Sequence, residues 1–227
     1  MSKDLTGRKL GIIHAAAITI PAVQRFITEV VPEVEVVHWL DDTIQNTNFA
    51  CEPGIIPPGN YAKFVQAALS QQEYGVDLIL LVCSTFNRAV EYARPMLETP
   101  LLQIDRPMMD LAVQAGSRVG LLATVPTTVP SSERLLRFAA EEAGRTVEIK
   151  TRLCSEAFQV LKAGDPEKHN EMLLEEIDLL SDEVDSIILA QLSMTALEPR
   201  LGETKVPVYN SGRTAFSRIR NILESLP

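Results

Sequence analysis

Short aliphatic runs alternate along the chain with stretches of helical periodicity. The aliphatic runs predict β-strands at 9–14, 34–40, 78–82, 100–103, 118–123, 147–153, 187–190 and 207–210. The intervening patterns predict helices at 21–30, 61–74, 107–115, 130–143, 165–180 and 214–226, with 86–97 partly helical. The runs 78–82 and 187–190 are apolar at every position, as in parallel strands that are covered on both faces. This alternation predicts an α/β fold with parallel sheets.

One segment interrupts the pattern. Residues 41–60 hold two Asp, three Asn, three Pro and two Gly, and they predict a long loop. Long loops in compact domains are often functional or mobile. We expect this loop either to cover a cleft or to be an ordinary surface loop.

The order of these segments repeats within the chain. Residues 11–21 (GIIHAAAITIP) match 120–130 (GLLATVPTTVP) at an offset of 109, which Arg25 and Arg134 also keep. Residues 77–83 match 185–191 at an offset of 108, and 100–103 match 207–210 at 107. Four segments in one order predict an internal duplication with a pseudo-twofold axis. Cys83 and Gln191 would then occupy equivalent strand ends that face one cleft.

Composition narrows the function. The chain has 227 residues, 46% of them hydrophobic, which suits two units of ordinary domain size. A net charge of −9 argues against nucleic acid and against an anionic membrane surface as partners. Three widely spaced cysteines indicate neither a disulfide framework nor a metal site, and they favour a reducing cytoplasm. The first residues show no signal peptide, and no apolar run is long enough to span a membrane.

Polar groups gather where three predicted strands end. The loops Cys83–Asn87, 124–128 and 191–195 are rich in hydroxyl and amide side chains, and each precedes a predicted helix. Ligands of open α/β sheets bind beyond the carboxyl ends of the strands, and free backbone N–H groups there hold small anions. The predicted binding residues are Ser84, Thr85, Asn87, Thr124, Thr127, Ser193 and Met194. Helix capping alone is the alternative explanation for these loops.

Cys83 is the most reactive candidate, because a helix N-terminus lowers a thiol pKa and favours the thiolate. A buried structural cysteine is the alternative. Cys51 and Cys154 are expected to be structural or incidental. His14 ends the first strand, so it would either line the cleft or be a histidine satisfied within the core. Asp105 and Asp110 follow the fourth strand and are expected to be solvated or to cap a helix.

The duplicated halves, Cys83-Ser-Thr, the GLLAT-x-x-T segment and the LAQ-x-SM segment resemble the aspartate/glutamate racemase superfamily, over essentially the whole chain. The resemblance implies two similar flavodoxin-like or Rossmann-like parallel-sheet domains around a pseudo-twofold axis. We place the first domain at 1–112 plus 210–227 and the second at 113–209. It also implies a central site for a small carboxylate, without a metal or an organic cofactor. In family racemases one cysteine removes the α-proton and a second returns it from the opposite face.

Cys83 takes the place of the first cysteine of that pair, and Gln191 stands at the second. Glutamine cannot serve as an acid or base, so we expect one-sided chemistry in which Gln191 orients the ligand by hydrogen bonds. The leading interpretation is a cofactor-independent isomerase or racemase that acts next to a carboxylate or carbonyl. A decarboxylase or other lyase is the first alternative, and a non-catalytic carboxylate-binding protein is the second. A homo-oligomer is possible.

Overall fold

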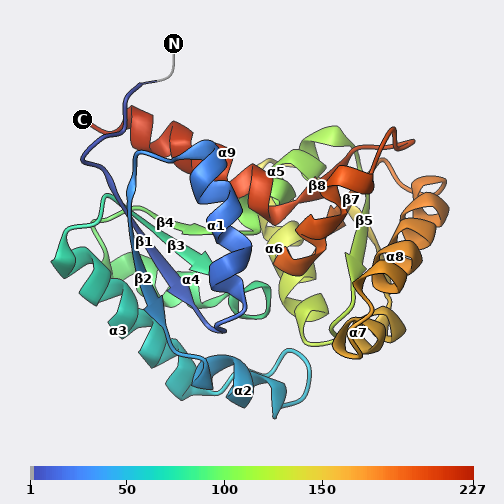
Figure 1. Ribbon diagram of the computed structural model, residues 1–227, viewed down its shortest axis with the longest axis horizontal. Helices are drawn as coiled ribbons and strands as arrows, with labels where there is room; N and C mark the ends of the chain where they lie inside the picture. Colours follow the sequence, from blue (N-terminus) through green and yellow to red (C-terminus); the bar gives the residue numbers. More distant parts are fainter. Residues whose placement is uncertain (1–2) are drawn as a thin grey trace.

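The computed structural model describes residues 3–227 and contains two four-stranded parallel sheets (Figure 1). The strands of the first sheet are β1 (Lys9–His14), β2 (Glu35–Leu40), β3 (Leu78–Val82) and β4 (Leu101–Gln103). Those of the second are β5 (Arg118–Ala123), β6 (Glu148–Leu153), β7 (Ser186–Leu189) and β8 (Val208–Asn210). Their spatial orders are β2-β1-β3-β4 and β6-β5-β7-β8, which is the same order written twice. This identity confirms the predicted duplication of an α/β unit.

The helices follow the predicted places, with two additions. They are α1 (Thr19–Val30), α2 (Thr43–Phe49), α3 (Pro58–Tyr74), α4 (Ala89–Ala93), α5 (Arg106–Ala115), α6 (Thr128–Glu142), α7 (Ser155–Lys162), α8 (Pro166–Ser181) and α9 (Ser211–Ser225). Three 3₁₀ segments join them, η1 (Ser84–Phe86), η2 (Arg94–Met96) and η3 (Leu192–Arg200). The prediction of a continuous loop over 41–60 was wrong, because α2 lies within it. The sequence analysis also missed α7. None of the helices within residues 3–227 is long and apolar enough to cross a membrane.

The central strands of each sheet are buried on both faces, which explains their unbroken apolar runs. In β3, Leu78, Leu80 and Val82 pack with α1 and α9, whereas Ile79 and Leu81 pack with α3 and α4. The second sheet repeats this arrangement, with α5 and α6 on one face and α8 on the other. Helices α1, α9, α5 and α6 therefore lie between the two sheets (Figure 1).

The halves contact each other through a matched pair of interactions. The loop η1 after β3 packs on α6 of the second half, and η3 after β7 packs on α1 of the first. Arg25 of α1 forms an ion pair with Glu198 of η3, at 2.6 Å. Arg134 of α6 forms the equivalent pair with Glu91 of α4, at 2.7 Å. The same ion pair therefore forms at both contacts between the halves, as the predicted pseudo-twofold relation requires.

The last helix of each unit packs on the other unit. Helix α9 follows β8 but joins the hydrophobic cluster of the first sheet, where Phe216 stacks on Phe26. Helix α5 follows β4 but joins the cluster of the second sheet through Met108, Met109 and Val113. The packing therefore changes from one cluster to the other before α5, ahead of the boundary expected at 112–113. The domain division itself stays a prediction.

Equivalent glycines allow helices to approach the central strands. A Cβ atom added to Gly120 of β5 would lie 2.6 Å from Leu180 Cδ2 and 3.1 Å from Ile187 Cγ1. Gly120→Ala should therefore lower the free energy of unfolding by about 1–3 kcal/mol through overpacking, measured by urea denaturation. Gly59→Ala is the matched control, since an added Cβ there meets no atom within 4 Å. Equal stability of the two variants would contradict this account of the packing.

Candidate active site

Cys83 stands at the carboxyl end of β3, where the first half meets the second. It is extended (φ −165°, ψ 107°) and directly precedes η1, which packs on α6. Next to it, Thr85 Oγ1 lies 3.5 Å from Thr128 Oγ1 of α6. The Cys83 thiol is 3.5 Å from Gln45 Oε1 and donates to it. The thiol thus lies at the junction of the halves, beneath a polar side chain of α2.

The pKa of the Cys83 thiol is raised, whereas the sequence led us to expect a lowered value. Although the residue keeps some solvent exposure, burial of the sulfur raises its pKa to about 12, and the nearby charge of Asp105 adds to the rise. The backbone N–H groups of Phe86 and Thr85 favour the thiolate but do not offset these effects. The expected helix is only the three-residue turn η1, too short to supply a helix dipole. In this conformation Cys83 is a thiol.

A buried polar cluster lies behind η1. Asn87 Nδ2 donates to Asp105 Oδ2 at 2.9 Å and to the carbonyl of Ser84 at 3.0 Å. Gln103 Nε2 donates to the carbonyl of Asn87 at 3.2 Å. Asn87, Gln103 and Asp105 are all buried. Asn87 therefore fixes the shape of the Cys83 loop, and its amide nitrogen is engaged within the protein.

Asp105 was expected to be solvated or to cap a helix, and both expectations were wrong. It is fully buried, and although it precedes α5 its side chain makes no capping hydrogen bond. Burial raises its pKa to about 6, while Asn87 and the hydroxyls of Ser84 and Ser211 partly offset the rise. The two hydroxyls lie near the carboxyl without the distance and angle of a hydrogen bond, so Asp105 Oδ1 and Ser211 Oγ both have no hydrogen-bond partner. Asp110, by contrast, forms an ion pair with Arg106 at 2.7 Å.

In the second half, Gln191 holds Thr124 with both ends of its amide. Gln191 Oε1 accepts from the Thr124 N–H at 2.7 Å, and its Nε2 donates to Thr124 Oγ1 at 2.8 Å. This differs from the expectation that the Gln191 amide itself orients the ligand. Because Thr124 Oγ1 already accepts a hydrogen bond, its own proton is free to be donated elsewhere.

Two predicted binding residues are core residues instead. His14 is fully buried, and its ring nitrogens lie 2.7 Å from Thr19 Oγ1 and 2.9 Å from His38 Nδ1. Its burial lowers the pKa to about 4, so the ring is neutral at pH 7. Met194 is 1% exposed and packs in the cluster around α8, because it lies on the inner side of η3. Neither faces a cleft.

The remaining predicted residues differ in accessibility. Ser193 is exposed, Ser84 is half-buried, and Thr85 is buried. Thr127 is half-buried, yet its hydroxyl is enclosed and has no hydrogen-bond partner. Their roles in binding stay predictions.

The 41–60 segment extends from one half to the other. The N–H of Gln45 donates to the carbonyl of Ala15 beyond β1, while a Cβ added to Gly54 would lie 3.3 Å from Pro130 of α6. Buried Asn60 ties α2 to α3 by donating to the Ile44 carbonyl, Thr47 Oγ1 and Asn48 Oδ1. The segment is thus an ordered cover over the thiol, and Figure 1 shows α2 at the edge of the molecule.

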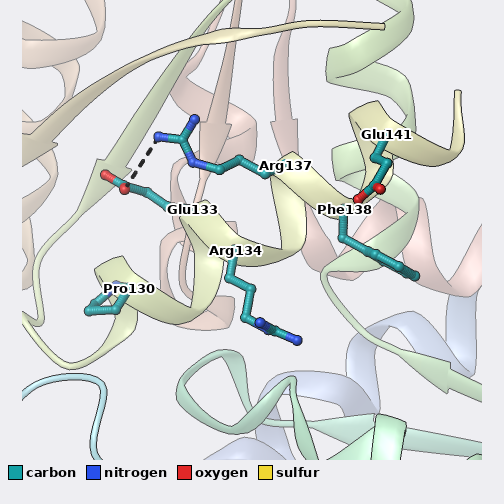
Figure 2. Close-up of a pocket in the computed structure, with 6 residues that line it drawn as sticks. All are labelled: Pro130, Glu133, Arg134, Arg137, Phe138 and Glu141. Atoms are coloured by element: carbon teal, nitrogen blue, oxygen red, sulfur yellow. Dashed lines mark ion pairs between the residues drawn. The ribbon is translucent and has the colours of Figure 1, made fainter. Parts of the chain in front are cut away.

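One well-defined surface depression lies elsewhere. It has a volume of about 530 Å³ and is formed by one face of α6: Pro130, Glu133, Arg134, Arg137, Phe138 and Glu141 (Figure 2). Glu133 and Arg137 form an ion pair within it. None of the predicted site residues contributes to its lining. Within residues 3–227, no group of three His, Cys, Asp or Glu side chains is placed to hold a metal ion.

Sequence reasoning missed Gln45 and Asp105. Gln45 lies in the segment 41–60, which was predicted to be a loop. The length of that loop was the only feature that indicated a function. Asp105 follows a strand end by two residues, which is a common place for ligand-facing groups, but such a position is also common for solvated caps. Its burial depends on α9, which is more than 100 residues away.

The comparisons with known proteins agree on one family. The family model described as Asp/Glu/Hydantoin racemase matches residues 44–219. The hydantoin racemase of Rhizobium meliloti is 26% identical over 186 residues, covering 80% of this chain and 73% of its own length.

Solved structures share the fold. An aspartate racemase homologue from Pyrococcus horikoshii OT3 superposes with a TM-score of 0.72 at 16% identity, covering 96% of this chain and all of that one. The allantoin racemase of Klebsiella pneumoniae gives a TM-score of 0.69 at 17% identity, covering 96% of this chain and 88% of its own. This likeness confirms the expected fold of two similar α/β units.

Asp105→Asn tests the burial of the carboxyl. A folded-state pKa of about 6, against 3.8 ordinarily, means that the folded protein keeps this proton while the unfolded chain loses it. The contribution of Asp105 to stability is therefore full below about pH 4 and is lost as pH rises to about 6. The loss is about 3 kcal/mol, from 1.36 kcal/mol per pKa unit.

The stability of Asp105→Asn relative to the unmodified protein should therefore rise by up to about 3 kcal/mol as the pH rises from 4 to 7. Its amide N–H₂ can also donate where Oδ1 and Ser211 Oγ have no partner. Urea denaturation at pH 4 and pH 7.5 measures the change. A variant that loses stability equally at both pH values would show that Asp105 is not a strained acid.

Proposed function

We propose that this chain, which belongs to the Asp/Glu/hydantoin racemase family, is an isomerase that moves a proton at a carbon next to a carboxylate or carbonyl of a small acid. Cys83 is the acid–base group. The observation that carries the proposal is the placement of its sulfur, at a strand end between the halves and in contact with the side chain of Gln45.

The proton balance of this reaction is simple. The Cys83 thiolate takes the α-proton, so the C–H bond breaks, an S–H bond forms, and the electron pair moves onto the substrate carbonyl as an enolate. Return of the proton from sulfur to the same face of the carbon regenerates the thiolate and the starting enantiomer, and the inverted product forms only when water protonates the opposite face. Because the resting group is a thiol, its proton must first pass to water or hydroxide as the substrate displaces Gln45, which leaves the thiolate that abstracts the α-proton.

Neutral donors of the second half suit the oxygen of the enolate. The Thr124 hydroxyl is oriented by Gln191 and keeps a free proton, and the enclosed hydroxyl of Thr127 has no partner. Donors aimed at the place where negative charge develops lower the barrier most. Thr124 and Thr127 are therefore the proposed oxygen-binding residues, and Gln191 is the residue that positions Thr124.

The relatives narrow the substrate class. One is named a hydantoin racemase, and solved structures of the same fold are named allantoin and aspartate racemases. For this chain we propose a small carboxylic acid or cyclic amide with an acidic α-carbon, and the experiment below includes both. Assembly into a homo-oligomer and a cytoplasmic location stay predictions.

One observation favours a lyase as the second candidate. Decarboxylation of a 2-substituted malonate creates a carbanion without proton abstraction, so the enzyme needs an acid and not a base. A thiol with a pKa of about 12 is already in the acid form. Release of CO₂ from malonates would support this alternative. If the protein catalysed neither proton exchange nor CO₂ release, the remaining interpretation would be a carboxylate-binding protein.

Cys83→Ser should abolish turnover. Amino acids, 5-substituted hydantoins and 2-substituted malonates are incubated in heavy water, and label at the α-carbon is measured by mass spectrometry. Loss of a general acid–base group should lower exchange by about 10²–10⁴-fold. Cys154→Ser and Cys51→Ser are the matched controls and should retain activity. Full activity of Cys83→Ser together with loss of activity in Cys154→Ser would show that Cys83 is not the reactive thiol.

The absence of a thiol at 191 predicts stereospecific exchange. With one acid–base group on one face, the unmodified protein should place label in one enantiomer with little racemisation. Gln191→Cys should raise the ratio of racemisation to exchange, although loss of the Thr124 hydrogen bonds should lower stability by about 1–3 kcal/mol. Gln191→Ala is the matched control, since it removes the same hydrogen bonds without adding a thiol.

Chiral chromatography and α-label together measure this ratio. Efficient racemisation by the unmodified protein would contradict the one-sided reaction. Equal ratios in Gln191→Cys and Gln191→Ala would show that a thiol at 191 cannot reach the substrate.

A further inference from the structure

The carboxyl of Asp105 is turned into the protein beneath the Cys83 loop. Its own helix, α5, does not use it as a cap, and its Oδ2 instead accepts from Asn87, whose amide also bonds the carbonyl of Ser84. Its Oδ1 has no hydrogen-bond partner. Unpaired buried carboxyl oxygens are costly, so a residue that served packing alone would gain nothing from this group.

The duplication shows that the second half dispenses with this group. Extending the match of β4 with β8 pairs Asp105 with Gly212, 107 residues later. A Cβ at Gly212 would lie 2.2 Å from Phe26 Cε2, so no side chain fits there. The second half therefore lacks both the thiol, replaced by Gln191, and the carboxyl. The two acidic groups occur together in the first half.

We infer that Asp105 is a positioning residue for the proton of Cys83, allowing the pair only one negative charge at a time. This inference rests on the proposed role of Cys83. When Asp105 is ionised, its charge opposes formation of the nearby thiolate, and Cys83 keeps its proton. When Asp105 takes up a proton from solvent, its charge disappears, and transfer of the thiol proton to water or hydroxide costs less free energy, although burial of the sulfur still favours the thiol.

The other groups that face Asp105 are neutral, so they do not obscure this coupling. Asn87 and Ser84 approach from the Cys83 loop, and Ser211 approaches from α9. Arg106, the next residue, directs its guanidinium to Asp110 and Glu142. The charge of Asp105 contributes to the raised pKa of Cys83, whereas no comparable effect of Asp110 on that thiol is found.

The consequence is that Cys83 is a protonated thiol before the substrate binds. At neutral pH, burial of the sulfur and the charge of the ionised Asp105 together keep Cys83 as a thiol, ready to protonate a carbanion or enolate. Below about pH 6 the neutral Asp105 no longer opposes the thiolate. Asp105 touches neither substrate nor reacting carbon in this scheme and acts only through the charge of its buried carboxyl.

The test measures the thiol directly. In a Cys51→Ser/Cys154→Ser background, Cys83 is the remaining cysteine of the sequence, and its reaction with 4,4′-dithiodipyridine is followed between pH 4 and 9. Asp105→Asn should speed this reaction about tenfold at pH 7.5, the equivalent of one unit of thiol pKa. Asp110→Asn, which removes a half-buried ion-paired carboxylate from α5, is the matched control and should leave the rate unchanged.

The unmodified Asp105 gives a second, independent readout. The logarithm of the rate against pH should flatten near pH 6 as Asp105 ionises, and it should be straight in Asp105→Asn. The same rate in both proteins, or a straight profile in both, would overturn the inference.

This experiment separates the inference from the proposed function. Unchanged thiol reactivity together with inactive Cys83→Ser would refute the role of Asp105 and leave Cys83 in place. Coupled thiol reactivity together with active Cys83→Ser would refute the catalytic role of Cys83 and leave the coupling in place.

Discussion

The contact of each strand-end loop with the first helix of the other half positions everything else in the candidate site. The loop η1 rests on α6, and η3 rests on α1. The ion pairs Arg134–Glu91 and Arg25–Glu198 repeat at both contacts but are partly exposed, and such pairs contribute little to stability. Burial of the helices between the sheets supplies the free energy, and the ion pairs set the register. Cys83 lies where it does because its loop cannot shift without uncovering α6.

The duplication made much of this predictable from the residues. Constant offsets between the halves predicted identical strand orders, and the apolar runs of β3 and β7 predicted central strands covered on both faces. Cys83 and Gln191 were found because equivalent strand ends can be compared directly. These inferences need only local pattern and chain order, which the sequence contains.

The errors have a common physical cause. Asp105 and Met194 are buried by segments distant in the sequence, and residues near strand ends look alike whether they face solvent, a cleft or the core. The prediction of a lowered thiol pKa was wrong for the same reason. Enclosure of the sulfur and the charge of a nearby buried carboxyl outweigh the backbone amides. Helix α2 was missed because its polar residues resemble a loop, while its stability comes from Asn60 of α3. Local propensity cannot report such tertiary partners.

The asymmetry between the halves carries the functional argument. A duplicated fold that kept a symmetric site would be expected to offer matching acid–base groups on both faces of a ligand. Here Gln191 of the second half is hydrogen-bonded to Thr124, while the first half holds a thiol whose pKa is raised by its burial and by the charge of a nearby buried carboxyl. Buried ionisable groups reduce stability, and local costs of this kind are usual at functional sites. The cost falls on the half with the thiol, which supports the proposal that this half handles the proton and the other half binds the developing charge.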